Sequence, residues 1–242
     1  MKKFWSDLFY DAVVILVRWL AYWPTGGIKG YGRQNVPRRG PVIIAPNHVS
    51  HLDPPAVALT CPRRLRFMAK EELFHNPFFG CILRACRAFP VRRGAGDTEA
   101  IRWTLASLER GEAVLMFPEG TRGDTRQLGF VNRGIVMIAK RSGAKIVPVA
   151  LVGTHTKMPK GSRWKRGFVR VVFGEPFTYE DIAAKTANDK EAREALVAEW
   201  ERQIIEMAGQ YGWTLKSAPK SQPTTAPNRP GTSSEEKPPS PV

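Results

Sequence analysis

A histidine and an aspartate, His48 and Asp53, stand with four residues between them in the run NHVSHLDP, directly after a short apolar segment. In a turn, this spacing brings the imidazole and the carboxylate together, and the carboxylate can fix the tautomer of the ring and stabilise its protonated form. The other ring nitrogen is then a base toward a hydroxyl group, which is worth roughly 10²–10⁴ in rate. The spacing therefore indicates general-base catalysis.

The same two residues also have a structural interpretation. Asp53 precedes Pro54, and an aspartate followed by proline is typical of a helix start, where the aspartate caps and proline occupies the first turn. His48 would then be a surface loop residue. One carboxylate can serve both purposes, so this motif alone leaves both interpretations open.

The run FPEGTR follows a second apolar segment. Pro118 and Gly120 predict a tight turn that presents Glu119, Thr121 and Arg122 together. Arg122 can hold a phosphate through two parallel hydrogen bonds, and backbone N–H groups of the turn can face an oxyanion. The alternative is a charged surface hairpin.

Two further runs carry weaker signals. FPVRRG begins like a third strand and carries Arg92 and Arg93. IVPVAL has the pattern of an apolar strand and is centred on Pro148. Alone, the arginine pair is more typical of a solvated surface than of a binding site.

In this order and spacing, the four runs resemble the lysophosphatidic acid acyltransferase family, the bacterial 1-acyl-glycerol-3-phosphate acyltransferases. NHVSHLD, FPVRR, FPEGTR and IVPVAL resemble its four ordered blocks, and MAKEELFHNPFFG resembles its lysine-containing stretch between the first two. The resemblance covers about residues 30–176. The sequence departs from the family at Asn132, where lysine is common, although Arg133 follows and can supply the charge.

The resemblance implies direct transfer of an acyl group from acyl-CoA or acyl-carrier protein to the sn-2 hydroxyl of lysophosphatidic acid, giving phosphatidic acid. His48 and Asp53 would be catalytic, and no metal or other cofactor is expected. Glu119 would order the site or hold the glycerol of the acceptor. The expected substrate-binding residues are Lys70, Arg93, Glu119, Gly120, Thr121 and Arg122. Another lysophospholipid or an aminoacyl lipid is the alternative acceptor.

Apolar runs and helix signals alternate through the middle of the chain, which predicts an α/β domain with a largely buried sheet flanked by helices. The resemblance implies that this sheet is mixed, as in a glycerol-3-phosphate acyltransferase-like fold. We expect an N-terminal helix in residues 1–25, the catalytic domain in residues 26–212 and a disordered tail in residues 213–242. The expected strands are 42–45, 65–69, 113–117, 146–152 and 168–173. The expected helices are 97–110 and 134–141, with one or two helices in 181–208.

The composition limits the partners. The 242 residues carry a formal net charge of +15, which suits nucleic acid, an anionic membrane or an anionic substrate. Basic residues interleaved with aromatics, which nucleic-acid binding would favour, are not found. Cys61, Cys81 and Cys86 are odd in number and form no CxxC pair, which argues against a disulfide framework or a zinc site.

Residues 4–23 are the most apolar stretch, but Asp7, Asp11 and Arg18 interrupt it. Since a spanning helix needs about 20 mostly apolar residues, and the stretch is rich in tryptophan, we expect an amphipathic helix lying in the membrane interface. The alternative is a helix packed on the protein's own core. The expected location is the cytoplasmic face of the cell membrane, peripheral or monotopic. The basic clusters expected to face anionic lipid are Arg63, Arg64, Arg66 and Lys160, Arg163, Lys165, Arg166.

Overall fold

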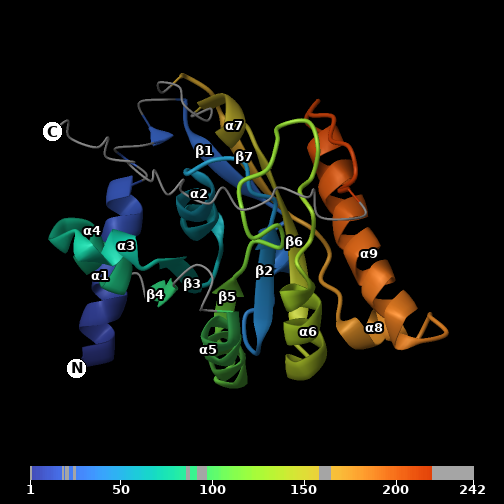
Figure 1. Cartoon of the computed structure of the whole chain (residues 1–242). Helices are drawn as coiled ribbons and strands as arrows, with labels where there is room; N and C mark the ends of the chain where they lie inside the picture. The colour runs from blue at the N-terminus through green and yellow to red at the C-terminus, as the bar shows by residue number, and fades with distance from the viewer. Residues whose placement is uncertain are drawn as a thin grey trace, which may run out of the picture.

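The computed structural model describes residues 2–17, 19, 22–23, 26–85, 88–91, 97–157 and 165–219. Within them, seven strands form one central sheet in the order β1-β7-β6-β2-β5-β3-β4 (Figure 1). The strands are β1 Ile28–Tyr31, β2 Val42–Pro46, β3 Leu65–Lys70, β4 Ala88–Val91, β5 Ala113–Leu115, β6 Lys145–Val152 and β7 Val169–Phe173.

The directions of the strands bring the sequence motifs to one place. Strands β2, β3, β4, β5 and β6 are mutually parallel, whereas β7 is antiparallel to β6 and β1 is parallel to β7. The carboxyl ends of five strands therefore share one edge of the sheet, and the segments following β2, β4, β5 and β6 all begin there. In open α/β sheets, ligands bind at this edge.

Helices cover both faces of the sheet, which is why its central strands are continuous apolar runs. The first core cluster joins the strands to α6 and α9, with α5 beside them, and the second joins them to α2 and to Tyr22. This arrangement confirms the predicted α/β class with a mixed sheet flanked by helices. The helices are α1 Lys2–Val17, η2 Arg33–Asn35, α2 Asp53–Thr60, α3 Glu72–His75, α4 Pro77–Ala85, α5 Asp97–Glu109, α6 Arg133–Ser142, α7 Thr154–Lys157, α8 Tyr179–Ala183 and α9 Asp189–Gly209.

Side-chain caps decide several boundaries. Asn132 caps α6, because its Oδ1 accepts a hydrogen bond from the Gly134 N–H at 3.1 Å, and Gly143 ends the helix in the left-handed region with φ 59°. Asn132 thus has a structural role at the position where the family often has lysine. Asn188 caps α9 in the same way, so the segment 181–208, predicted to form one or two helices, falls in two, α8 and α9.

The N-terminal helix α1 turns its polar side toward the domain. Tyr10 is buried, with its hydroxyl accepting from the Leu65 N–H at 3.3 Å, and Asp11 pairs with Arg64 at 2.7 Å. Large apolar side chains of the helix are exposed at Leu8, Phe9, Ile15 and Leu16, and Trp19 and Trp23, which follow the helix, are exposed as well. Of the helices in the described ranges, none is both long and apolar enough to cross a bilayer.

Part of the predicted tail packs against the domain. Leu215 is buried, the Lys216 N–H donates to the carbonyl of Arg126 at 2.9 Å, and the Trp213 indole donates to the carbonyl of Thr125 at 2.9 Å. These contacts hold the loop that follows FPEGTR. The predicted tail from residue 220 onward lies outside the described residues.

Candidate active site

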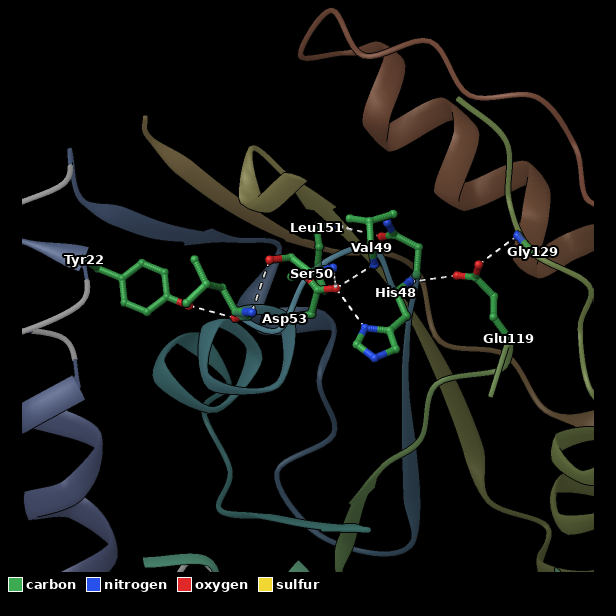
Figure 2. Close-up of polar contacts among 10 residues, drawn as sticks. Tyr22, His48, Val49, Ser50, Asp53, Glu119, Gly129 and Leu151 are labelled. Carbon is green, nitrogen blue, oxygen red and sulfur yellow. Dashed lines mark hydrogen bonds and ion pairs between the residues drawn. The ribbon is translucent and has the colours of Figure 1, made fainter. Parts of the chain in front are cut away.

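The base loop, residues 47–53, follows β2 at the carboxyl edge of the sheet. Within it, the Nδ1 atom of His48 lies 2.9 Å from Oδ2 of Asp53 (Figure 2). The Asp53 side chain is fully buried, whereas that of His48 is 17% exposed. The carboxylate therefore holds Nδ1 from the buried side of the ring, and the opposite side of the ring is open to solvent.

The Asp53 carboxylate also shapes the loop that carries the histidine. Its Oδ2 atom accepts hydrogen bonds from the backbone N–H groups of Val49 and Ser50, both at 2.7 Å. Leu52, not Asp53, occupies the N-cap position of α2, and Asp53 is the first residue of the helix. The predicted capping role of Asp53 is therefore wrong, because its bound oxygen faces residues 48–50 rather than the N–H groups of its own helix.

The imidazole of His48 rests on an aromatic ring. The ring of Phe117 stacks on it with centroids 4.0 Å apart and an interplanar angle of 29°. With Nδ1 bound to Asp53, the tautomer carrying hydrogen on Nδ1 leaves a lone pair on Nε2. The geometry thus orients Nε2 as a base for a group entering beside Phe117.

Glu119 ties the base loop to the loop that follows β5. Its two carboxylate oxygens each accept one backbone hydrogen bond at 2.7 Å, from the N–H of His48 and from the N–H of Gly129 (Figure 2). Burial raises the pKa of the Glu119 carboxyl to about 7, against the effect of the two donors and with a smaller contribution from the charge of Asp53. Because both oxygens are already engaged, the geometry favours an ordering role over a direct hold on the acceptor's glycerol.

Glycines make room for this carboxylate. A Cβ atom built on Gly129 would lie 2.5 Å from Oε2 of Glu119, and one built on Gly123 would lie 2.7 Å from the same oxygen. Gly120 serves a different purpose, because its φ of 67° is in the left-handed region that turns the chain after Glu119. The sequence after β5 is therefore glycine-rich for steric reasons.

The outer residues of the FPEGTR turn face solvent. Gly120 and Thr121 are exposed and Arg122 is half-buried. Gly123, the next residue, donates its N–H to the carbonyl of His48 at 2.8 Å, which places Arg122 beside the base loop. Arg122 has no carboxylate partner within the described residues, so its guanidinium remains available to an anion.

The other predicted cations divide into three groups. Lys70 is the last residue of β3, at the active-site edge, and nothing beyond its backbone is described. Arg93 lies outside the described residues, as do Arg92, Lys160 and Arg163. Lys165 and Arg166 are exposed.

The arginine cluster expected to face lipid has internal partners instead. Arg63 donates to the carbonyls of Pro37, Gly40 and Gly111, at 3.1, 2.8 and 2.7 Å. Arg64 pairs with Asp11, and Arg66 pairs with Glu112 at 2.6 Å. The prediction of a free basic surface at Arg63, Arg64 and Arg66 is therefore wrong, because these side chains hold loops and α1 in place.

A cavity of about 1610 Å³ is lined in part by Pro54, Phe117 and Gly120, which adjoin the base loop, although no residue of the base loop itself lines it. Its lining extends over the β3–β5 region and helices α5, α6 and α9. An apolar acyl chain delivered from a membrane would be expected in a groove near the N-terminal helix, but none of the described residues of α1 lines this cavity. Apolar side chains in its wall include Phe67, Met68, Ile101, Leu115, Val136 and Met137.

Two site residues were not singled out from the sequence. Phe117 stacks on the base, and Asn47, fully buried, accepts the Leu151 N–H at 2.8 Å through its side-chain oxygen, fixing the base loop to β6. Asn47 directly precedes His48 in the motif NHVSHLD, and Phe117 stands two residues before Glu119 in FPEGTR. These positions within the motifs could have indicated a role in the site. By contrast, burial raises the pKa of the Cys61 thiol to about 11, which keeps it protonated and unsuited to nucleophilic attack.

The chain is similar in sequence to known proteins. A model of the Acyltransferase family matches residues 27–152. The chain is 33% identical over 159 residues to the 1-acyl-sn-glycerol-3-phosphate acyltransferase of Bacillus subtilis, covering 65% of this chain and 77% of that protein. It is 32% identical over 187 residues to the protein of the same name from Streptococcus pneumoniae, covering 76% and 67% respectively.

Two further similarities bear on fold and acceptor. The crystal structure of the 1-acyl-sn-glycerophosphate acyltransferase PlsC from Thermotoga maritima superposes with a TM-score of 0.64 at 26% identity, covering 84% of this chain and 78% of that one. The lyso-ornithine lipid O-acyltransferase of Pseudomonas aeruginosa is 33% identical over 114 residues, covering 47% of this chain and 43% of that protein.

Proposed function

Because this chain belongs to the acyltransferase family, we propose that it transfers a fatty acyl group from a thioester to the sn-2 hydroxyl of lysophosphatidic acid, giving phosphatidic acid. The observation that carries this proposal is the His48–Asp53 contact, with the His48 ring stacked on Phe117, which lines the cavity, and with Arg122 next to the residue that bonds the His48 carbonyl. It brings together a base that can deprotonate an alcohol and a cation that can bind a phosphate.

The reaction needs one proton carrier. Nε2 of His48 takes the proton of the acceptor hydroxyl while the oxygen attacks the thioester carbonyl carbon. The C–O bond forms, the tetrahedral intermediate collapses, and the C–S bond breaks. The leaving thiolate takes the proton from the imidazolium and departs as a thiol, so no acyl-enzyme and no cofactor beyond the donor is required.

Asp53 and Glu119 support this step without transferring the proton. The Asp53 carboxylate at 2.9 Å from Nδ1 stabilises the imidazolium that forms after proton abstraction. Glu119 holds the backbone of His48 against the FPEGTR turn. These contacts, with the bond from the Gly123 N–H to the His48 carbonyl, fix the backbone of the base loop relative to the FPEGTR turn that carries Arg122.

The acceptor phosphate would meet Arg122, with Lys70 and Arg93 as further cations and the exposed backbone of Gly120 and Thr121 in the same turn. Hydrogen bonds to a charged group contribute roughly 1.5–3 kcal/mol each. Either acyl-CoA or acyl-carrier protein would supply the thioester. The acyl chain would occupy the cavity beyond Phe117, whose wall is largely apolar.

We place the enzyme on the surface of an anionic membrane, at its cytoplasmic face. The support is the exposed apolar side of α1 with Trp19 and Trp23 beyond it, while Asp11 and Tyr10 anchor the other side to the domain. Aromatic and aliphatic side chains so arranged bind at the headgroup boundary. Replacing Ile15 and Trp19 with glutamate is expected to abolish co-sedimentation with phosphatidylglycerol vesicles, and unaltered co-sedimentation would contradict the assignment.

An acceptor panel tests the proposed reaction. Purified enzyme, one labelled acyl-CoA and a set of lysolipids should give fastest turnover with lysophosphatidic acid. A second candidate acceptor is lyso-ornithine lipid, because the chain is similar to an enzyme of that name. Preference for an acceptor without a phosphate, unaffected by loss of Arg122, would replace the first assignment with the second.

A further inference from the structure

Tyr22 connects the N-terminal segment to the base loop. This tyrosine follows α1 in the chain, its side chain is fully buried, and its hydroxyl donates to the carbonyl of Leu52 at 2.8 Å (Figure 2). Leu52 directly precedes Asp53. A residue of the lipid-facing segment thus contacts the backbone next to the buried carboxylate.

The contact joins a connected set of hydrogen bonds. The Leu52 N–H donates to the Ser50 hydroxyl at 3.2 Å, and the Ser50 N–H donates to Oδ2 of Asp53, which holds His48. Figure 2 shows these contacts running from Tyr22 to the imidazole. A shift of the Leu52 carbonyl would therefore move the residues that orient the base.

The Leu52 carbonyl has a second partner. The N–H of Ala56 donates to it at 3.0 Å, as the first backbone bond of α2. Removing only the Tyr22 hydroxyl would leave this buried carbonyl hydrogen-bonded, so the fold would lose little stability. The role of the hydroxyl in positioning can therefore be separated from a role in folding.

The phenol remains a donor under all working conditions. Burial, with a smaller contribution from the negative charge of Asp53, raises the pKa of Tyr22 far above its ordinary value. The hydroxyl accordingly keeps its proton and its hydrogen bond to Leu52 at any pH at which the enzyme works.

We propose that Tyr22 is a positioning residue, through which docking of the N-terminal segment on lipid and domain orients His48 and Asp53 for catalysis. The inference rests on the proposed membrane-surface acyl transfer. It gives a physical reason for turnover to depend on lipid: α1 is held to the domain by Tyr10 and Asp11, and Tyr22 extends this attachment into the active site.

The test compares Tyr22→Phe with Tyr211→Phe and the wild type. Tyr211 packs on Tyr31 and takes no part in the contacts of α1 or of the base loop described above. On phosphatidylglycerol vesicles, Tyr22→Phe should lower kcat about tenfold and leave both KM values and vesicle binding within about twofold. Tyr211→Phe should leave kcat within about twofold. Wild-type kcat in Tyr22→Phe, with vesicle binding retained, would overturn the proposal.

A spectroscopic measurement keeps the test decisive if Tyr22→Phe unfolds. The His48 Nδ1–H proton, hydrogen-bonded to Asp53, should give a downfield NMR resonance that exchanges more slowly when wild-type enzyme binds vesicles. Exchange that vesicles do not change would overturn the proposal. Failure of the proposed function is seen differently, as wild-type enzyme that acylates no lysolipid in the panel.

Discussion

The base loop and the outer part of the FPEGTR turn lie side by side but are built in opposite ways. In the base loop, Asp53 accepts the His48 ring and two backbone N–H groups, and Asn47 is bonded to β6. In the turn, Thr121 is exposed and Arg122 has no acidic partner within the described part of the chain. In the proposed mechanism, the groups that move a proton are fixed in advance, whereas the groups that would meet a charged substrate are left open to it.

Replacing His48 with alanine should cause the largest effect. Because His48 is the side chain that Asp53 orients as the proposed base, kcat should fall by about 10³ or more, while the thermal midpoint changes little. Steady-state kinetics and calorimetry check this, with His75→Ala, an exposed histidine of α3, as the matched control. Substantial turnover in a folded His48→Ala enzyme would remove the base assignment.

Glu119 should make stability fall with pH. Its pKa is 4.5 as an ordinary carboxyl and about 7 here, so the folded state binds the proton more tightly than the unfolded state. The resulting stability is present below pH 4.5 and is lost as pH rises to about 7, by about 3 kcal/mol at 1.4 kcal/mol per unit.

Denaturant unfolding at several pH values measures this change, with Glu119→Gln as the reference that cannot titrate. The wild-type free energy of unfolding should decline relative to the variant only between pH 4.5 and 7. Parallel curves through that interval would show that Glu119 titrates normally.

Replacing Arg122 with alanine should act on binding rather than on chemistry. Loss of one charge-assisted hydrogen bond, roughly 1.5–3 kcal/mol, should raise KM for lysophosphatidic acid about tenfold to a hundredfold with kcat within a fewfold. Initial rates over a range of acceptor concentrations test this. Arg126→Ala, exposed in the same loop, is the control, and equal effects of the two variants would contradict a specific phosphate contact.

Replacing Gly129 with alanine should have the smallest effect, about 1–3 kcal/mol of stability. The added methyl would lie 2.5 Å from Oε2 of Glu119 and displace the bridge between the two loops. Chemical denaturation measures the loss. Gly134→Ala, whose nearest neighbour is 3.7 Å away, should be neutral or slightly stabilising, and an equal loss in both variants would show that the effect does not come from contact with Glu119.

The central elements could be predicted from the sequence because their apolar runs are continuous and their ends are marked by residues such as glycine and proline. Strands β2, β6 and β7 appear within a residue of their predicted bounds, and Gly143 ends α6 as expected. Strand β1, IKGY, was not predicted, since lysine and glycine interrupt any apolar pattern. Its place in the sheet depends on pairing with β7, far away in the chain.

Proximity at the active site was predictable only in part. Local spacing brings His48 to Asp53, but the contact of Glu119 with the backbone of His48 depends on the adjacency of β2 and β5. Arg63, Arg64 and Arg66 illustrate the limit: composition shows three positive charges, and only tertiary structure shows that carbonyls and carboxylates already occupy them. Tyr22 carried no signal in the sequence, because its partner is a backbone carbonyl.

The pairing of β1 with β7 also has a consequence for folding during synthesis. A ribosome delivers Ile28 141 residues before its partner Val169, so β1 has no neighbour in the sheet until that intervening chain has been made. During that interval the apolar side of α1 is exposed and the domain that follows it has not completed its sheet. Nascent chains with such surface exposed are prone to aggregate, and early capture of this helix by the bilayer would protect the chain until its last strand arrives.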